Sequence, residues 1–249
     1  MKSTILLLTI AFSLLATVFT RSQESNPFEG DGDQKHTPRM IRIQAEFIEM
    51  PQPTYTSLMA KPRTSANDTN LRAECAKLIE KGEAGILETL CLTALPGQSA
   101  TVESIAELTY PTEYNPGRVP ERVNGATPPP DTPWGSPPTP SSFDTKNTGS
   151  TLEVEAHIDS NGKVVELRLS PTIVYHVDTI NWGSEKRAGA AGPIEMPVFY
   201  VLKMRTGVIL VDGQPCMIAA QSPKDDKGFT NGSRKIMVFV RAEILNVGQ

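Results

Sequence analysis

The chain has 249 residues, with 24 Lys or Arg against 28 Asp or Glu, so its formal net charge is −4. This balance excludes the basic surface that binding to nucleic acid or to anionic lipid requires. Apart from 21 prolines and few aromatic residues, the composition is that of a globular protein long enough for one large domain or two small ones.

The N-terminus has the form of a secretory signal peptide. Lys2 precedes an apolar run from Ile5 to Phe19, and a run of about 15 residues is short for a membrane span of roughly 20. We expect residues 1–20 to be removed on export, with an uncleaved anchor helix as the alternative. The polar residues 21–38 predict a disordered leader.

Residues 40–82 change from the period of a strand to that of a helix. Residues 40–50 alternate apolar and polar side chains, which predicts a strand. The proline-rich segment 51–64 is interpreted as a connection. Apolar residues then recur at helical spacing up to Gly82, which predicts a helix over 69–81.

A turn signal and a proline-rich stretch follow the helix. The apolar segment 84–95 and the alternating segment 100–108 flank a Pro-Gly turn, which predicts a hairpin. Residues 115–142 contain nine prolines and predict a long extended loop. Trp134 in its middle is a candidate contact residue, and a loosely tethered loop without a partner is an equal alternative.

The clearest pattern in the chain is the hairpin over 148–177. Each arm has one apolar and one polar face, and the turn around Gly162 suits the positive φ of a tight turn. Because proline has no N–H to donate, Pro171 should mark a bulge, an edge or a strand break.

The last third predicts more strands. The Gly- and Ala-rich segment 178–196 is interpreted as a loop, and a strand should start at Pro197. Residues 208–218 predict a hairpin turning at Asp212-Gly213, then a polar loop reaches Ser233 and a long strand covers 235–244. The predicted fold class is β-rich, mostly antiparallel hairpins with one short helix, an α+β minority.

Signatures of catalysis are missing from the sequence. It contains no GxSxG, HExxH or GxGxxG motif, and its three histidines are scattered. We therefore expect no enzyme, no cofactor and no metal site. In an oxidising compartment Cys75 and Cys91 could pair, whereas the favoured alternative is that these two and Cys216 are buried thiols.

The order of these pieces resembles the C-terminal core domain of bacterial secretins, the outer-membrane proteins of type II and III secretion systems. The likeness covers about 40–245 and rests on the blocks IRIQAEFIEM, ILETLCLTALPGQSATVESIAELTYPTEY, NTGSTLEVEAHIDSNGKVVELRLSP, TGVILVDGQPCMIAA and IMVFVRAEIL. The family-motif positions are Gly149, Leu152, Val154, Gly162, Asp212, Gly213 and Gln214.

The chain also departs from the family pattern. The double glycine after Asp-Gly-Gln is Ala219-Ala220 here, and the usual proline of the central strand is Ala156. The small periplasmic domains that precede a secretin core are not found in this chain. These differences bear on pore assembly and gating.

The resemblance implies that residues 39–249 form one secretin-like β domain with a secretin-core-like sheet. In that family, strands from many subunits build a common barrel with a polar lumen. The implied function is a structural or oligomerising envelope component of protein secretion, in the outer membrane or periplasm. Its partners would be further copies of itself or other secretion-system proteins, with no nucleic acid. The alternative is a soluble periplasmic interaction or scaffold module, derived from the same fold, that forms no pore.

Overall fold

The structure is a computed structural model of the chain. Residues 1–20, predicted as a signal peptide, lie outside its described part, as do 21–37 of the predicted leader and Trp134. All the described residues belong to one compact unit, Thr37–Gln249. The described ranges are 38–62, 65–118, 125, 136–183, 192–225 and 227–248.

The first sheet has four antiparallel strands in the order β2-β1-β9-β8. Its central pair joins opposite ends of the sequence, from Arg39 opposite Asn246 to Pro51 opposite Arg234. The strands predicted over 40–50 and 235–244 are therefore confirmed, and both are longer than expected. The bounds are β1 Arg39–Pro51, β2 Gly85–Ala94, β8 Cys216–Gln221 and β9 Arg234–Asn246.

The second sheet has five antiparallel strands in the order β3-β4-β5-β6, with β7 also paired to β5. The predicted central hairpin is confirmed as β4 and β5. The bounds are β3 Ser99–Asn115, β4 Thr139–Ile158, β5 Val164–Asn181, β6 Glu195–Lys203 and β7 Thr206–Val211.

Pro171 lies inside β5 without breaking it. On one edge of β5, β7 pairs with Val164–Leu169 and β6 pairs with Thr172–Asn181. The proline falls in the gap between these two neighbours, where its missing N–H leaves no ladder hydrogen bond unmade. Its carbonyl oxygen accepts a hydrogen bond from Met204 N at 3.2 Å. A strand break at this position is therefore ruled out.

The described part of the chain contains two helices, α1 at Gln52–Met59 and α2 at Thr69–Glu80. The helix predicted over 69–81 is confirmed. The interpretation of 51–64 as an extended connection is wrong, and so is the prediction of a single helix. Pro53 stands in the first turn of α1, where the backbone N–H has no helical acceptor, so proline there starts a helix instead of preventing one.

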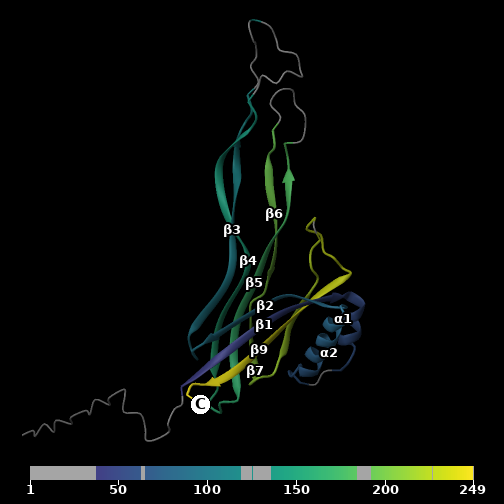
Figure 1. The fold of residues 1–249 in the computed structure, drawn as a ribbon, viewed down its shortest axis with the longest axis vertical. Helices are drawn as coiled ribbons and strands as arrows, with labels where there is room; N and C mark the ends of the chain where they lie inside the picture. The colour runs from purple at the N-terminus through teal and green to yellow at the C-terminus, as the bar shows by residue number, and fades with distance from the viewer. Residues whose placement is uncertain are drawn as a thin grey trace, which may run out of the picture. The chain divides into compact units, whose positions relative to one another are not determined.

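These elements form three layers (Figure 1). The two sheets face each other across a core of alternating apolar side chains, and each fully buried one contributes about 1.5–3 kcal/mol. The helices cover the other face of the first sheet through a second cluster. The inter-sheet core includes Ile41, Ile43, Phe47, Leu152, Leu167, Leu210 and Val238, and the helix-side cluster includes Ile48, Met50, Leu71, Cys75 and Phe239.

Two predicted hairpins are wrong. The strands on either side of Pro96-Gly97 do not pair, because β2 joins β1 while β3 joins β4. In the same way β7 joins β5 and β8 joins β9, so Asp212-Gly213 does not close a hairpin either. Both turns carry the chain from one sheet to the other, and turn residues alone do not distinguish such a corner from a hairpin.

The loops predicted over 115–142 and 178–196 are shorter than expected. Strand β3 reaches Asn115 and β4 already begins at Thr139, so Pro140 lies in a strand. Likewise β5 runs to Asn181 and β6 begins at Glu195. Prolines are accepted near irregular pairing, and the β3–β4 register shifts close to both Pro111 and Pro140.

Candidate functional site

The second sheet divides into two ribbons at Gly149. Pairing between β4 and β5 ends at Gly149 opposite Val174, whereas each strand continues beyond this point with its other neighbour. We call Ala106–Asn115 paired with Thr139–Thr148 ribbon 1, and Tyr175–Asn181 paired with Glu195–Tyr200 ribbon 2. Figure 1 shows both ribbons running beyond the part of the sheet that packs on β1 and β9.

The division point requires glycine. Gly149 has φ +114°, a conformation that L side chains rarely adopt. A Cβ at this position would lie 2.1 Å from the carbonyl oxygen of Ser104 and 3.0 Å from Cα of Ile105, both in the backbone of β3. This family-motif residue therefore lets β3 stay close to β4 where β4 leaves β5.

The two ribbons contact each other through β3 and β6. The Tyr114 hydroxyl accepts a hydrogen bond from Glu195 N at 3.1 Å and donates one to Glu195 O at 3.2 Å. Nearer the body, the rings of Tyr110 and Phe199 lie 5.7 Å apart, and His176 also packs on Phe199. Strands at opposite edges of one sheet thus come together at their far ends.

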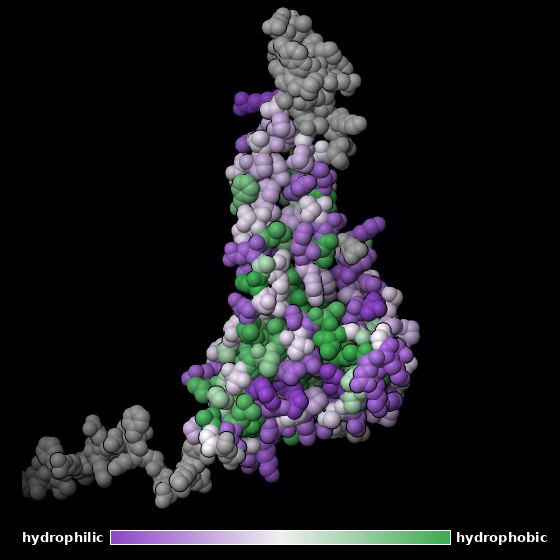
Figure 2. Space-filling view, in the orientation of Figure 1, coloured by the Kyte–Doolittle hydropathy of each residue, from purple (hydrophilic) through white to green (hydrophobic). Residues whose placement is uncertain are grey.

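Polar side chains add to the backbone ladder of ribbon 1. Hydroxyls of Thr109 and Thr145 lie 3.2 Å apart across the two strands, and Ser142 donates to Glu113 at 2.9 Å. Phe143 is an isolated exposed aromatic residue, 61% accessible. Figure 2 shows the ribbon surface as mostly hydrophilic, with hydrophobic side chains scattered along it.

Both outer strands of this sheet have an open edge. Among the strands that the structure describes, β3 pairs only with β4, and β6 pairs only with β5. An open edge exposes a row of backbone donors and acceptors to which another strand can add. At 17 residues, β3 is unusually long for an edge strand.

Three further motif residues lie along the β4–β5 hairpin and at its turn. Leu152 and Val154 are buried between the sheets. Gly162, at φ +66°, closes the turn by donating from its N–H to the carbonyl of Asp159 at 3.0 Å. The Asp159 carboxylate accepts from the N–H groups of Lys163 and Val164, both at 3.2 Å.

The turn Asp212-Gly213-Gln214 connects the two sheets beside the Gly162 turn. The N–H of Asp212 donates to Lys163 O at 3.0 Å, and its carboxylate accepts from Ile244 N at 2.8 Å. The N–H of Gly213 donates to Ala242 O at 2.8 Å. The structure thus brings Gly162 together with the Asp-Gly-Gln motif and places Gly149 at the opposite end of the hairpin. None of this grouping follows from sequence spacing.

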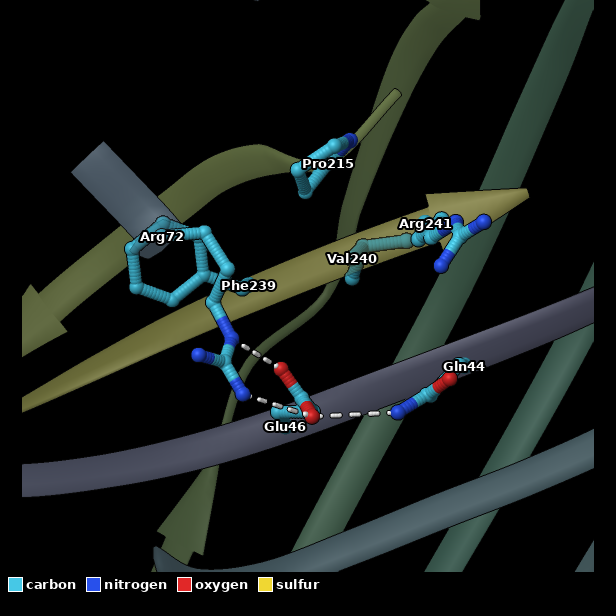
Figure 3. A pocket seen from close by; sticks show the side chains of 7 residues that line it. All are labelled: Gln44, Glu46, Arg72, Pro215, Phe239, Val240 and Arg241. Carbon is cyan, nitrogen blue, oxygen red and sulfur yellow. Dashed lines mark hydrogen bonds and ion pairs between the residues drawn. The ribbon is translucent and has the colours of Figure 1, made fainter. Parts of the chain in front are cut away.

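A pocket of about 170 Å³ lies between α2 and the first sheet (Figure 3). Arg72 reaches from α2 to Glu46 on β1 with two hydrogen bonds, at 2.6 and 3.2 Å, and Gln44 donates to the same carboxylate at 3.0 Å. The hydrogen bond to Glu46 raises the pKa of Arg72. The ion pair between Arg72 and Glu46 fastens α2 to the first sheet. Because the two charges neutralise each other, this pair presents no free charge to the pocket.

The three cysteines, all within the described ranges, differ in environment, and none of them forms a disulfide. Cys75 is buried under α2, where burial raises its pKa to about 11, and Cys91 is exposed on β2. The possible Cys75–Cys91 pair is therefore not formed, and the expectation of three buried thiols holds only for Cys75, because Cys91 is exposed and Cys216 is half-buried. Within the described ranges, no three His, Cys, Asp or Glu side chains gather to hold a metal, and neither helix is long and apolar enough to cross a membrane.

Comparison with known proteins gives matches only among solved structures. No protein-family model and no curated protein sequence matches the chain. The type II secretin GspD of enteropathogenic Escherichia coli is 15% identical, with 85% of this chain and 70% of that chain covered and a TM-score of 0.41. The secretin in the ETEC pilotin–secretin AspS–GspD complex is 14% identical, with 85% of this chain and 50% of that chain covered and a TM-score of 0.43. The V. cholerae type IV competence pilus secretin PilQ is 12% identical, with 83% of this chain and 59% of that chain covered and a TM-score of 0.40. The chain thus spans 50–70% of the lengths of these three proteins.

Proposed function

We propose that this chain is a secretin-like envelope protein, a structural component of protein secretion that assembles with copies of itself through the edges of its second sheet. The observation that carries the proposal is the pair of ribbons, which leave the packed body with β3 and β6 as open edges. The order of the sequence blocks that resemble a secretin core supports the same function.

The two open edges have the strand directions that antiparallel pairing between copies requires. Three successive antiparallel pairings separate β3 from β6, so the two strands run in opposite directions. When β6 of one copy lies beside β3 of the next, the sheet continues as antiparallel neighbours. The contact joins different surfaces of identical chains, and repeating it by rotation closes a ring that leaves no free edge.

The polar surface of the ribbons fits a position beside water. Ribbon 1 carries polar side chains such as Thr109, Ser142 and Thr145 beside its few aromatic ones. The outer face of the sheet adds Glu155, which lies 3.9 Å from Arg168 and 3.2 Å from His157. In barrels built from several chains, such a face lines the water-filled interior. Export through the segment 1–20 and a place in the outer membrane or periplasm complete the proposal.

The test is the native mass of the full chain, extracted from its own membranes in mild detergent. A ring of many subunits is expected. Val201→Lys, on the open edge strand β6, should prevent most of the assembly because a charged side chain there opposes edge pairing. The matched control is Ile86→Lys on β2 of the first sheet. Ile86 is 47% exposed and Val201 45%, and this control should assemble like the wild type.

Two results would overturn the proposal. A wild-type chain that remains a monomer or dimer at all concentrations would leave the soluble interaction module, and Trp134 would become the residue to examine. Equal loss of assembly in both variants would show that the β6 edge has no special role. If rings form, planar-bilayer conductance distinguishes a channel from a closed scaffold.

A further inference from the structure

The hydroxyl of Tyr114 does for β6 what a neighbouring strand would do. It offers one donor and one acceptor, and both are used by the backbone of a single residue, Glu195. An antiparallel strand satisfies an edge residue with the same pair of hydrogen bonds. The carbonyl of Ile194 accepts from Trp182 N at 2.9 Å on the β5 side, so the backbone groups of the next residue, Glu195, point away from β5, toward the open edge.

Pro197, the next residue of β6 that faces the open edge, can accept a hydrogen bond from a neighbouring strand but cannot donate one. Backbone groups of residues i and i+2 point to the same side of a strand, so Pro197 takes the orientation of Glu195 and has no N–H to donate. The Tyr110–Phe199 ring contact holds β3 over this stretch. The far half of the β6 edge has no strand neighbour, but Tyr114 occupies it at Glu195, while Val201 nearer the body is 45% exposed.

The covering residue comes from β3, the strand expected to meet this edge from a neighbouring copy. We propose that Tyr114 is an intramolecular latch: it occupies the β6 edge in the isolated chain and must be displaced by β3 of a second copy during assembly. This inference rests on the proposed function. It adds a regulated step, in which the same two edges meet first within one chain and then between chains.

The latch has a matched pair of test variants. Tyr114→Phe removes both hydrogen bonds to Glu195 and keeps the ring. Tyr110→Phe also removes one hydroxyl, but that hydroxyl bonds Asp144 within ribbon 1 at 3.4 Å and leaves the latch intact. Each variant differs from the wild type by one oxygen atom, so differences in folding should be small.

The first measurement is hydrogen exchange of the Glu195 amide in dilute full chain, before assembly. Protection is expected in the wild type and in Tyr110→Phe, and about tenfold faster exchange in Tyr114→Phe, since a net hydrogen bond is worth roughly a factor of ten. Equal exchange in all three proteins would overturn the latch, whether or not the chain assembles.

The second measurement is the protein concentration at which half of the chains are assembled. Tyr114→Phe should lower it about five- to tenfold, since less free energy is needed to uncover the edge, while Tyr110→Phe should leave it unchanged. An unchanged or raised value for Tyr114→Phe would overturn the inference while the proposed function stands. A wild type that never assembles would refute the proposed function and the regulated step, and hydrogen exchange would still report on the intramolecular contact.

Discussion

Replacing Gly149 by alanine should be costly for a reason visible in the backbone. At φ +114° an L residue costs on the order of 1–3 kcal/mol. The added Cβ would also stand 2.1 Å from the carbonyl oxygen of Ser104, which is a backbone atom and can move only if β3 moves. Displacing β3 weakens at least one ladder hydrogen bond, at about 1 kcal/mol each. We expect Gly149→Ala to lower the free energy of unfolding by about 2–4 kcal/mol.

The appropriate control is Gly213→Ala. Gly213 has φ +72°, and a Cβ there would have no atom within 4 Å, so only the backbone term of roughly 1–2 kcal/mol remains. Urea unfolding followed by circular dichroism gives both values, provided the transitions have equal slopes. If Gly149→Ala costs no more than Gly213→Ala, the close approach of β3 to β4 does not restrict this position and the reasoning is refuted.

Three further outcomes can be checked. Asp68→Ala should destabilise the chain by about 2 kcal/mol in urea unfolding, because this buried carboxylate accepts from Met217 N at 2.7 Å and ties α2 to β8; a cost below 0.5 kcal/mol would contradict that role. A thiol reagent near neutral pH should label Cys91 in the native chain and Cys75 only on unfolding, as peptide mass spectrometry would show; equal rates would contradict the buried position of Cys75. Burial raises the pKa of Asp159, but the hydrogen bonds from backbone N–H groups lower it by more than burial raises it. The folded pKa of Asp159 therefore lies below its unfolded value. Its stabilising effect is therefore present above about pH 4 and lost as the pH falls through the folded pKa, and the stability difference between wild type and Asp159→Asn should shrink in acid unfolding curves.

Alternation predicted most strands because it reports directly on burial. The apolar positions of β1, β4, β5 and β9 face one core, and each strand follows period two through that core. Helix α2 was predictable for the same reason, since Leu71 and Cys75 lie one turn apart on its buried side. Helix α1 has no fully buried residue, and Tyr55, Leu58 and Met59 pack on the second cluster while only partly buried. So short an apolar stripe was outweighed by Pro51 and Pro53, which were interpreted as loop residues.

Apart from the β4–β5 hairpin, the pairing partners were beyond what local patterns can give. Pro96-Gly97 and Asp212-Gly213 are genuine turns, but whether a turn closes a hairpin or crosses to another sheet depends on the second sheet. The contacts that define the candidate site are equally non-local. Tyr114 and Glu195 are separated by 81 positions, and no spacing rule connects them. Only the glycine at 149 carried a signal, through its place in the family pattern.

The pairing of β1 with β9 has a consequence for when the chain can fold. These strands lie at opposite ends of the described chain and form the centre of the first sheet, so the core between the sheets cannot close until the residues after Arg234 are available. Contacts of such long sequence separation make folding slow. A chain that emerges from a translocation channel would therefore complete its core only after the residues of β9 had passed. Refolding from urea should accordingly be slow, and rapid two-state refolding of a chain cut before Arg234 would contradict this dependence.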